Sequence, residues 1–484
     1  MASAKTTPSE QSPLVGGAGA EKGGTRASRD FVFTPDFVFT EVFGLFTIIA
    51  PALLGNMLEF YEFGIYVLVT PYMTAAFFSD YGDFGSTFGV WFGFSVSFVV
   101  RPFGGALFGY IGDRFGRRVS LIISVGGMIV CTAGIGLLPA HALVGLVLLV
   151  VFKICQGLFV GGELVTTVVF AVEHAGTELV ATAVAISVAT AAFGLLAASV
   201  VVLLIEYMTT DEQMYAWGWR VPFLLALPWG LLAMLLRSRL KESAVFAEHL
   251  KQSEAKPGGA DGQPGPMATV WRDYRLPFCL GILCTVGYAA GFWGCVMYPK
   301  DFLVDAGVRD VRTAIQCGVI GLLCAMSAQV AAGLLCDAYG ILRVCLVASA
   351  VVLVGVWPAW CLLVLPGQSW ASYVAMPLLG LMSGLQTGVA AATIELFPVH
   401  VRATGFGVAW NISQALGAAP APFVAKAVWA SLKERPGAGW LVDSAPALWP
   451  TLMVAVSGVA LLLLWRAGSQ GLLQPTHIRH SPYV

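Results

Sequence analysis

Charged residues are scarce in this sequence. Asp, Glu, Lys and Arg make up 11% of its 484 residues, whereas soluble domains carry about 25%. Hydrophobic residues account for 57%, and the mean hydropathy is +0.79. The few charges are grouped between long apolar runs, so the chain lacks the polar surface that a soluble protein of its size needs. A soluble enzyme, a fibre and a disordered chain are excluded, and a multi-pass helical membrane protein is predicted.

Three further absences limit the function. With a net charge of −1, the chain has no clustered basic face for nucleic acid. The 10 cysteines include no Cys-x-x-Cys pair and nearly all lie in apolar runs, so we interpret them as packing residues rather than disulfides or metal ligands. The 6 histidines fall in loops, helix ends or tails, which leaves proton transfer at mid-membrane to carboxylates. No cofactor is expected.

The first roughly 40 residues are polar and Gly-rich, without the apolar core of a cleavable signal peptide. Residues 10–15, EQSPLV, resemble an acidic dileucine sorting signal, although a solvated tail is the favoured interpretation. The predicted location is the plasma membrane or a bacterial inner membrane, with an endolysosomal membrane as the alternative.

Long apolar runs are abundant. A bilayer core of about 30 Å needs about 20 apolar residues per helix. Runs of this kind lie at 43–70, 86–108, 119–139, 142–171, 181–205, 217–238, 276–299, 311–334, 341–365, 371–394, 403–430 and 446–466. The expected fold class is therefore all-α integral membrane, with twelve transmembrane helices.

A polar stretch at 241–275 divides these runs six and six, and its Pro- and Gly-rich middle is typical of a flexible linker. If both termini are cytoplasmic, 18 of the 27 Lys and Arg residues lie in inside segments and 6 in outside segments, which favours that orientation. The predicted domains are an N-terminal tail at 1–41, a six-helix bundle at 42–240, the linker at 241–275, a second six-helix bundle at 276–466 and a C-terminal tail at 467–484.

Two motifs occur once in each half. The pairs are Gly109-x3-Asp113-x2-Gly116 with Gly333-x3-Asp337-x2-Gly340, and Glu173-x8-Thr182 with Glu395-x8-Thr404. Both fall at matching turns on the predicted cytoplasmic side. Two homologous six-helix bundles around a central cavity are typical of a secondary transporter that works by alternating access.

The stretch GYIGDRFGRR at 109–118 resembles the loop signature of the major facilitator superfamily. Segments 55–66, 101–118, 217–228 and 395–411 resemble its metabolite:proton symporter branch, whose members carry organic acids, proline and betaine. The resemblance spans about 42–466. It implies a carrier in the lipid bilayer, whose partners are a small-molecule substrate and protons. A monomer is expected, because each chain already contains both halves around one cavity.

The resemblance also implies a cytoplasmic gate around the loop signature. Asp113 can cap or face a helix N-terminus, and the loop arginines can pair with acids such as Glu173. The alternative is a plain positive-inside topology anchor. The candidate gate residues are Gly109, Asp113, Arg114, Gly116, Arg117, Arg118, Glu173, Asp337, Glu395 and Arg402.

Ionisable side chains inside a membrane need a partner or a pathway. The first predicted span carries Asn56, Glu59 and Glu62 at i, i+3 spacing, with Glu59 near mid-depth. We expect the two glutamates to bind protons or substrate, the alternative being a structural ion pair. The resembling branch usually has Asp where Glu62 stands.

Basic residues accompany these acids. Arg101 reaches towards the midplane, where it can bind an anionic substrate or neutralise Glu59 or Glu62. In the fourth span, Gln156 and Glu163 share a stripe, and Lys153 stands where the branch has Arg. Lys153 is expected either to face the cavity or to pair with Glu163 or Glu206. The second half offers fewer charges, and its candidates are Tyr288, Trp293, Gln386, Trp410, Asn411 and Gln414. The last three form the better wall for a small polar solute.

The preferred function is proton-coupled symport of a small organic acid, a mono-, di- or tricarboxylate. Counted from the sequence, the inner charges are Glu59, Glu62 and Glu163 against Arg101 and Lys153, which does not decide between an anion and a zwitterion. The alternatives are a proton-coupled carrier of zwitterionic osmolytes such as proline or betaine, a uniporter or sugar porter of the same fold, and a non-transporting nutrient receptor. An enzyme is not expected, because neither a Ser, His and Asp constellation nor a metal-spaced cluster lies at membrane depth.

Overall fold

The computed structural model describes residues 38–78, 82–140, 143–176, 178–243, 246–248, 265–435 and 439–470. Most of the two predicted tails and the middle of the predicted linker lie outside this part of the chain. Within it, every regular element is a helix, and eleven helical stretches are long and apolar enough to cross a membrane. The second apolar run, 86–108, lies in a further helix of 34 residues.

The first half of the chain forms one bundle. Its long helices are α2 (Phe43–Leu68), α4 (Gly82–Phe115), α5 (Arg117–Gly136), α6 (Leu143–His174), α7 (Val180–Met208) and α9 (Val221–Ser238). Shorter elements join them: η1 (Val38–Val42), α3 (Thr70–Phe78), α8 (Asp211–Ala216) and η3 (Gly218–Arg220). The glycines of α6 allow it to lie directly on α4, because a Cβ at Gly157 would come within 2.7 Å of the Ser97 carbonyl oxygen.

The second half forms another bundle. Its long helices are α12 (Arg275–Phe292), α14 (Val311–Tyr339), α15 (Ile341–Leu363), α16 (Ser369–Leu385), α18 (Arg402–Gly417) and α20 (Leu448–Ser469). The shorter elements are α11 (Pro266–Asp273), η5 (Trp293–Met297), α13 (Tyr298–Asp305), α17 (Gly388–Ile394), η6 (Val399–Val401), α19 (Ala421–Lys433) and η7 (Trp440–Ala447).

Three runs in this half that were expected to be continuous helices are interrupted. A π-helical turn, η5, separates α12 from α13, and a break at Gln386 and Thr387 separates α16 from α17. A third break lies between α18 and α19, where Pro420 precedes the new helix. Irregular backbone at membrane depth occurs where it is buried in protein or lines a cavity. Two of these breaks fit that rule, since Trp293 of η5 lines an internal cavity and Gln386 is buried.

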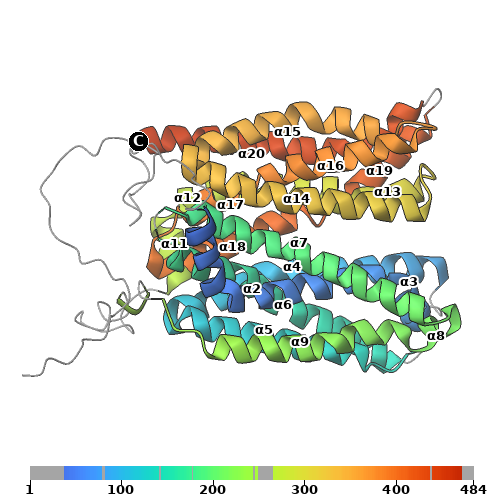
Figure 1. Ribbon diagram of the computed structural model, residues 1–484, viewed down its shortest axis with the longest axis horizontal. Helices are drawn as coiled ribbons and strands as arrows, with labels where there is room; N and C mark the ends of the chain where they lie inside the picture. The colour runs from blue at the N-terminus through green and yellow to red at the C-terminus, as the bar shows by residue number, and fades with distance from the viewer. Residues whose placement is uncertain are drawn as a thin grey trace, which may run out of the picture.

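The bundles meet along two helix pairs, α4 with α18 and α7 with α14. In Figure 1, α14, α15, α16 and α20 lie on one side, α2, α5, α6 and α9 on the other, and α7 runs beside α14. Buried apolar side chains of both bundles form one continuous cluster across this contact, including Val165 and Val184 from the first half and Tyr288 and Trp410 from the second.

The repeated motif explains how closely the bundles approach. A Cβ at Gly109 of α4 would lie 2.6 Å from Thr404 Cα of α18, and a Cβ at Gly333 of α14 would lie 2.6 Å from Ala185 Cβ of α7. The last glycine of each copy, Gly116 or Gly340, has a φ of 107° or 94°, a conformation that L side chains rarely adopt. We call the end of the molecule that holds these turns the latch end.

Replacing either close-approach glycine should therefore oppose closure of the latch end. We expect Gly109→Ala and Gly333→Ala each to destabilise the closed arrangement by about 1–3 kcal/mol, as overpacking does. Hydrogen exchange should then accelerate at the first turns of α18 and α7. Gly44→Ala is the matched control, since nothing lies within 4 Å of its added Cβ. Unchanged exchange in both variants would contradict the assigned contact.

A candidate translocation path and its latch

Two aspartates tie the bundles together at the latch end. Asp113, at the end of α4, accepts hydrogen bonds from the backbone amides of Ala403 and Thr404, at 3.2 and 2.8 Å, in the first turn of α18. Asp337, at the end of α14, accepts from the amides of Ala181 and Thr182, at 2.9 and 2.8 Å, in the first turn of α7. Each bundle thus caps a helix of the other, as expected for Asp113.

Arg117 adds a second connection at this end. Its fully buried guanidinium donates to Glu173 at 2.9 Å and to the Val399 carbonyl of the second bundle at 2.9 Å, and it lies 3.2 Å from Asp113. The expected pairing of a loop arginine with Glu173 is present. Arg114 and Arg118 are exposed and donate to the Tyr110 hydroxyl and the Ser238 carbonyl. Arg402 is buried and donates to the Phe397 carbonyl at 3.2 Å, and Glu395 is buried nearby in sequence.

The start of the predicted linker also belongs to the latch. Glu242 accepts from the backbone amides of Arg117 and Arg118, at 3.1 and 3.2 Å, at the first turn of α5. Ser243 donates to Glu173 at 2.6 Å, and the Phe246 ring lies 4.3 Å from the Arg117 guanidinium. The sequence placed these residues in a polar connector. An acid, a hydroxyl and an aromatic residue follow the sixth span directly in the sequence, and this pattern could have indicated that the start of the linker binds the loop arginines.

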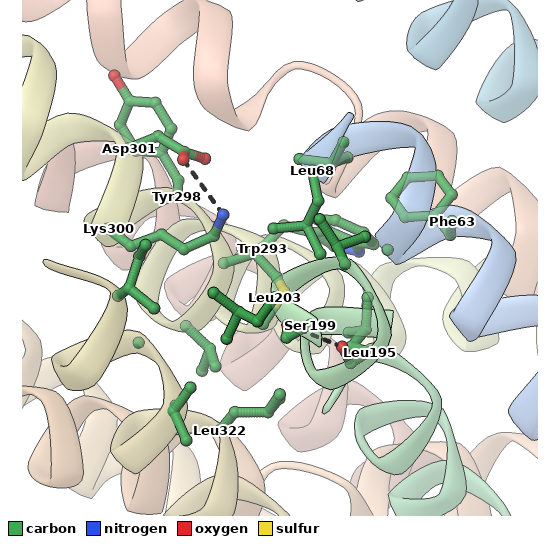
Figure 2. Close-up of a pocket in the computed structure, with 18 of the residues that line it drawn as sticks. Phe63, Leu68, Leu195, Ser199, Leu203, Trp293, Tyr298, Lys300, Asp301 and Leu322 are labelled. Carbon is green, nitrogen blue, oxygen red and sulfur yellow. Dashed lines mark hydrogen bonds and ion pairs between the residues drawn. The ribbon is translucent and has the colours of Figure 1, made fainter. Parts of the chain in front are cut away.

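At the opposite end the bundles stand apart around a chamber of about 290 Å³. Helices α2 and α7 form one wall, and η5, α13 and α14 form the other. Figure 2 shows Lys300 reaching in from α13 towards Asp301, on the side away from Phe63 and Leu68 of α2. We call this space the vestibule.

A smaller cavity of about 30 Å³ lies deeper, between the middles of the bundles. Seven of the candidate residues line it: Glu59, Arg101, Tyr288, Trp293, Trp410, Asn411 and Gln414. Among the described residues, no hydrogen-bond partner lies within reach of Glu59 Oε2 or Arg101 Nε. The Arg101 guanidinium instead lies 4.1 Å from the centre of the Phe98 ring. The cavity therefore combines an acid and a base with aromatic walls.

Glu62 has different surroundings from Glu59, although both lie on α2. Its neighbours are Lys153 and Thr132, inside the first bundle, and it also interacts with the charge of Arg101. The Lys153 ammonium donates to Gln156 at 3.0 Å and lies 3.7 Å from the centre of the Tyr66 ring, and Gln156 donates to Thr132 at 3.3 Å. These residues lie behind the midplane cavity rather than in its wall.

Lys153 is absent from the lining of the midplane cavity, which it was expected to face, and the alternative pairing with Glu163 or Glu206 is also absent. Glu163 is fully buried and paired through both oxygens with Arg237, and Ser124 donates to it as well. Glu206 lines the vestibule and accepts from the Tyr72 hydroxyl at 3.1 Å. Glu163 is absent from the cavity lining, because its partner holds it inside the first bundle.

The position of Arg237 also differs from the prediction. We counted it among the cytoplasmic loop charges, but its side chain is fully buried. It also donates to the backbone carbonyls of Leu121, at 2.9 Å, and Pro51, at 3.2 Å. Gly55 leaves space for the guanidinium, which a Cβ there would strike. One cation thus joins α2, α5, α6 and α9.

Two further candidate residues, Asn56 and Gln386, lie outside the lining of the midplane cavity. Asn56 donates to the Ser187 carbonyl and the Thr190 hydroxyl, both at 2.7 Å, and so joins α2 to α7. Gln386 is buried at the break between α16 and α17, and neither polar atom of its amide has a hydrogen-bond partner among the described residues.

Replacing Arg237 should lower the stability of the folded protein far more than replacing an exposed arginine nearby. Arg237→Met leaves the Glu163 carboxylate buried without its counter-charge, which destabilises a protein by about 3–5 kcal/mol. We expect a large fall in the melting temperature of the purified protein, and little change for the exposed control Arg239→Met. The double variant Arg237→Met with Glu163→Met should recover most of the loss. Equal effects of the two single variants would contradict the role of the pair.

Comparison with known proteins agrees with this architecture. A family model described as "Sugar (and other) transporter" matches residues 47–266. An ectoine/proline transporter of Corynebacterium glutamicum is 31% identical over 87% of this chain and 84% of its own length. An inner membrane metabolite transport protein of Escherichia coli is 30% identical over 88% and 95%. A proline/betaine transporter of Salmonella typhimurium is 29% identical over 75% and 74%.

Among solved structures, a major facilitator superfamily proton:xylose symporter bound to 6-bromo-6-deoxy-D-glucose superposes with a TM-score of 0.71. It is 17% identical, and the match covers 88% of this chain and 96% of that one. The likeness shows the shared fold: two six-helix bundles around a central cavity.

Proposed function

The chain belongs to the major facilitator superfamily, in its metabolite:proton symporter branch, and we propose that it carries a small zwitterion of the proline or betaine type together with protons. Its relatives are transporters, not enzymes. From the sequence alone, an organic acid was the preferred substrate and a zwitterion was an alternative. Relatives that transport proline, betaine or ectoine support the alternative better.

The observation that carries this proposal is the make-up of the midplane cavity. Because Arg237 neutralises Glu163, the charges left near the centre are two acids, Glu59 and Glu62, and two bases, Arg101 and Lys153. A solute without net charge leaves this balance undisturbed, whereas a di- or tricarboxylate adds buried negative charge that needs a further cation. The balance therefore disfavours a di- or tricarboxylate, and among the remaining solutes the named relatives favour a zwitterion.

Recognition follows from the groups in the wall. The Arg101 guanidinium suits the carboxylate of the solute, since its planar fork binds carboxylates through two hydrogen bonds. The substituted ammonium suits the carboxylate of Glu59 and the faces of the Tyr288 and Trp410 rings, which lie 5.7 Å apart. Aromatic faces attract quaternary ammonium groups through their negative quadrupole.

Proton binding is assigned to Glu62. It lies outside the lining of the solute cavity, so a proton and a solute can occupy neighbouring sites at the same time. Lys153 is its counter-charge. Because the ammonium stacks on Tyr66 and donates to Gln156, it does not hold the carboxylate in a rigid fork.

The arrangement of the two ends supports alternating access. The latch end is closed by the caps of Asp113 and Asp337, while the vestibule stands open between the bundles at the other end. We assign the latch end to the cytoplasm, with both termini inside a bacterial inner membrane and one chain as the working unit. Rocking of the bundles then exposes the cavity to each side in turn.

Uptake into liposomes tests this function. Under an inward proton gradient, proline and betaine should accumulate above their outside concentration, and a protonophore should abolish the accumulation. Glu62→Gln removes the titratable group, so accumulation should fall to equilibration while exchange of internal for external solute continues. Glu212→Gln, an exposed site on α8, is the matched control and should behave as the wild type.

Two results would contradict the proposal. Accumulation of citrate, succinate or lactate without proline or betaine would make the substrate class wrong. Proton-driven accumulation by Glu62→Gln at the wild-type level would place the proton site elsewhere.

A further inference from the structure

The two spaces along the path differ greatly in size. The midplane cavity of about 30 Å³ has room for only a few water molecules. The vestibule, at about 290 Å³, is roomy enough for a small organic solute. In this arrangement of the bundles, a solute that enters from the open end is therefore held in the vestibule before the midplane cavity can accept it.

Charges of both signs line the vestibule from opposite bundles. Glu206 of α7 lies in one wall, and Lys300 and Asp301 of α13 lie in the other. Lys300 donates to Asp301 at 3.2 Å, which leaves the ammonium with further protons to donate. Burial and the neighbouring Glu206 carboxylate raise the pKa of Tyr72 to about 12. Tyr72 therefore remains the hydrogen-bond donor to Glu206, whose other lone pairs stay available.

This distribution selects the charge type of a ligand. Two acids against one base disfavour a solute with net negative charge. A cation and an anion in opposing walls complement a solute that carries both charges. The rest of the wall is mainly aliphatic and aromatic, with Leu203, Leu322 and Phe63 among its residues. It suits the apolar body of such a solute.

Trp293 separates the two spaces, since it lines both. Its ring meets the Phe63 ring edge to face at 5.0 Å and the Phe98 ring at 5.5 Å, and the Arg101 guanidinium lies against Phe98. A solute moving inward must displace this aromatic cluster. Residence in the vestibule therefore precedes binding at the midplane.

We propose that the vestibule is a second, weaker binding site for the same small zwitterion, with its carboxylate at Lys300 and its ammonium at Glu206. The identity of the solute rests on the function proposed above. The site itself rests on the chamber and its opposing charges.

Equilibrium binding of radiolabelled proline to the purified full-length chain in lipid nanodiscs tests the site. The wild type should show a tight class of sites and a weaker one. Lys300→Met with Glu206→Gln should remove the weaker class, and Arg101→Met should remove the tight class. The matched control, Lys433→Met with Glu212→Gln, changes two charges outside the vestibule lining and should keep both classes. A melting temperature close to that of the wild type confirms that each variant is folded.

Transport provides an independent measurement. The vestibule double variant should raise the apparent KM for proline about two- to fivefold, the effect of one partly exposed ion pair, while kcat stays unchanged. If these charges only kept the bundles separated and did not bind solute, the double variant would instead lower kcat.

A single class of sites in the wild type, or both classes retained in the vestibule variant, would overturn this inference and leave the proposed function standing. No binding of proline or betaine to the wild type would overturn the proposed function, and this inference with it.

Discussion

The closed latch depends on one interaction made twice, a carboxylate of one bundle bound to the first amides of a helix in the other. The first amides of a helix have no partner within it, so a carboxylate placed there satisfies them and interacts favourably with the helix dipole. Asp113 does this for α18 and Asp337 for α7. Because each bundle gives one cap and receives one, separation of the bundles at the latch end breaks both caps. A cap contributes about 0.5–2 kcal/mol. Two caps thus favour closure by a few kcal/mol, a difference that ligand binding can reverse.

Contacts within a bundle are of another kind. Arg237 holds Glu163 through two hydrogen bonds and also binds backbone carbonyls of two other helices, with no exposed side-chain surface. Breaking such a pair leaves a buried charge and costs several kcal/mol. Because contacts inside a bundle are more costly to break than the caps between bundles, we expect the bundles to move as rigid bodies. We expect their relative motion to be greatest where α4 meets α18 and α7 meets α14.

Much of this was predictable because it depends on local pattern. Apolar run length predicted the helices, and the repeated Gly-x3-Asp-x2-Gly motif predicted matching turns, with Asp113 at a helix N-terminus. The helices that the aspartates cap were not predictable, because their partners are distant in sequence. The pairing of Glu163 with Arg237 was missed for the same reason. Glu163 was counted among the inner charges and Arg237 among the loop charges, because periodicity places a residue on a face without identifying what covers it. The helix breaks, such as the one at Gln386, lie in runs whose hydropathy is continuous.

The roles of Glu59 and Glu62 illustrate the same limit. Their spacing placed both on one face of α2, but only the positions of Arg101, Lys153 and Thr132 distinguish a group in the cavity wall from one behind it. Removing Glu163, which is paired with Arg237, leaves two acids and two bases among the central charges. The preference for an organic acid did not rest on this count, which left anion and zwitterion open, and it is the named relatives that favour the zwitterion.

The claim that the two aspartate caps hold the latch end closed is tested most directly by double electron–electron resonance, which measures distances between spin labels at each end of the molecule. Spin labels at the exposed positions Val119 and Arg343 report the latch end, and labels at Tyr207 and Trp370 report the vestibule end. Asp113→Ala combined with Asp337→Ala should lengthen the first distance and shorten the second, without substrate, relative to the otherwise unchanged chain. A latch end that stays closed in this double variant would contradict the claim that the two caps hold it.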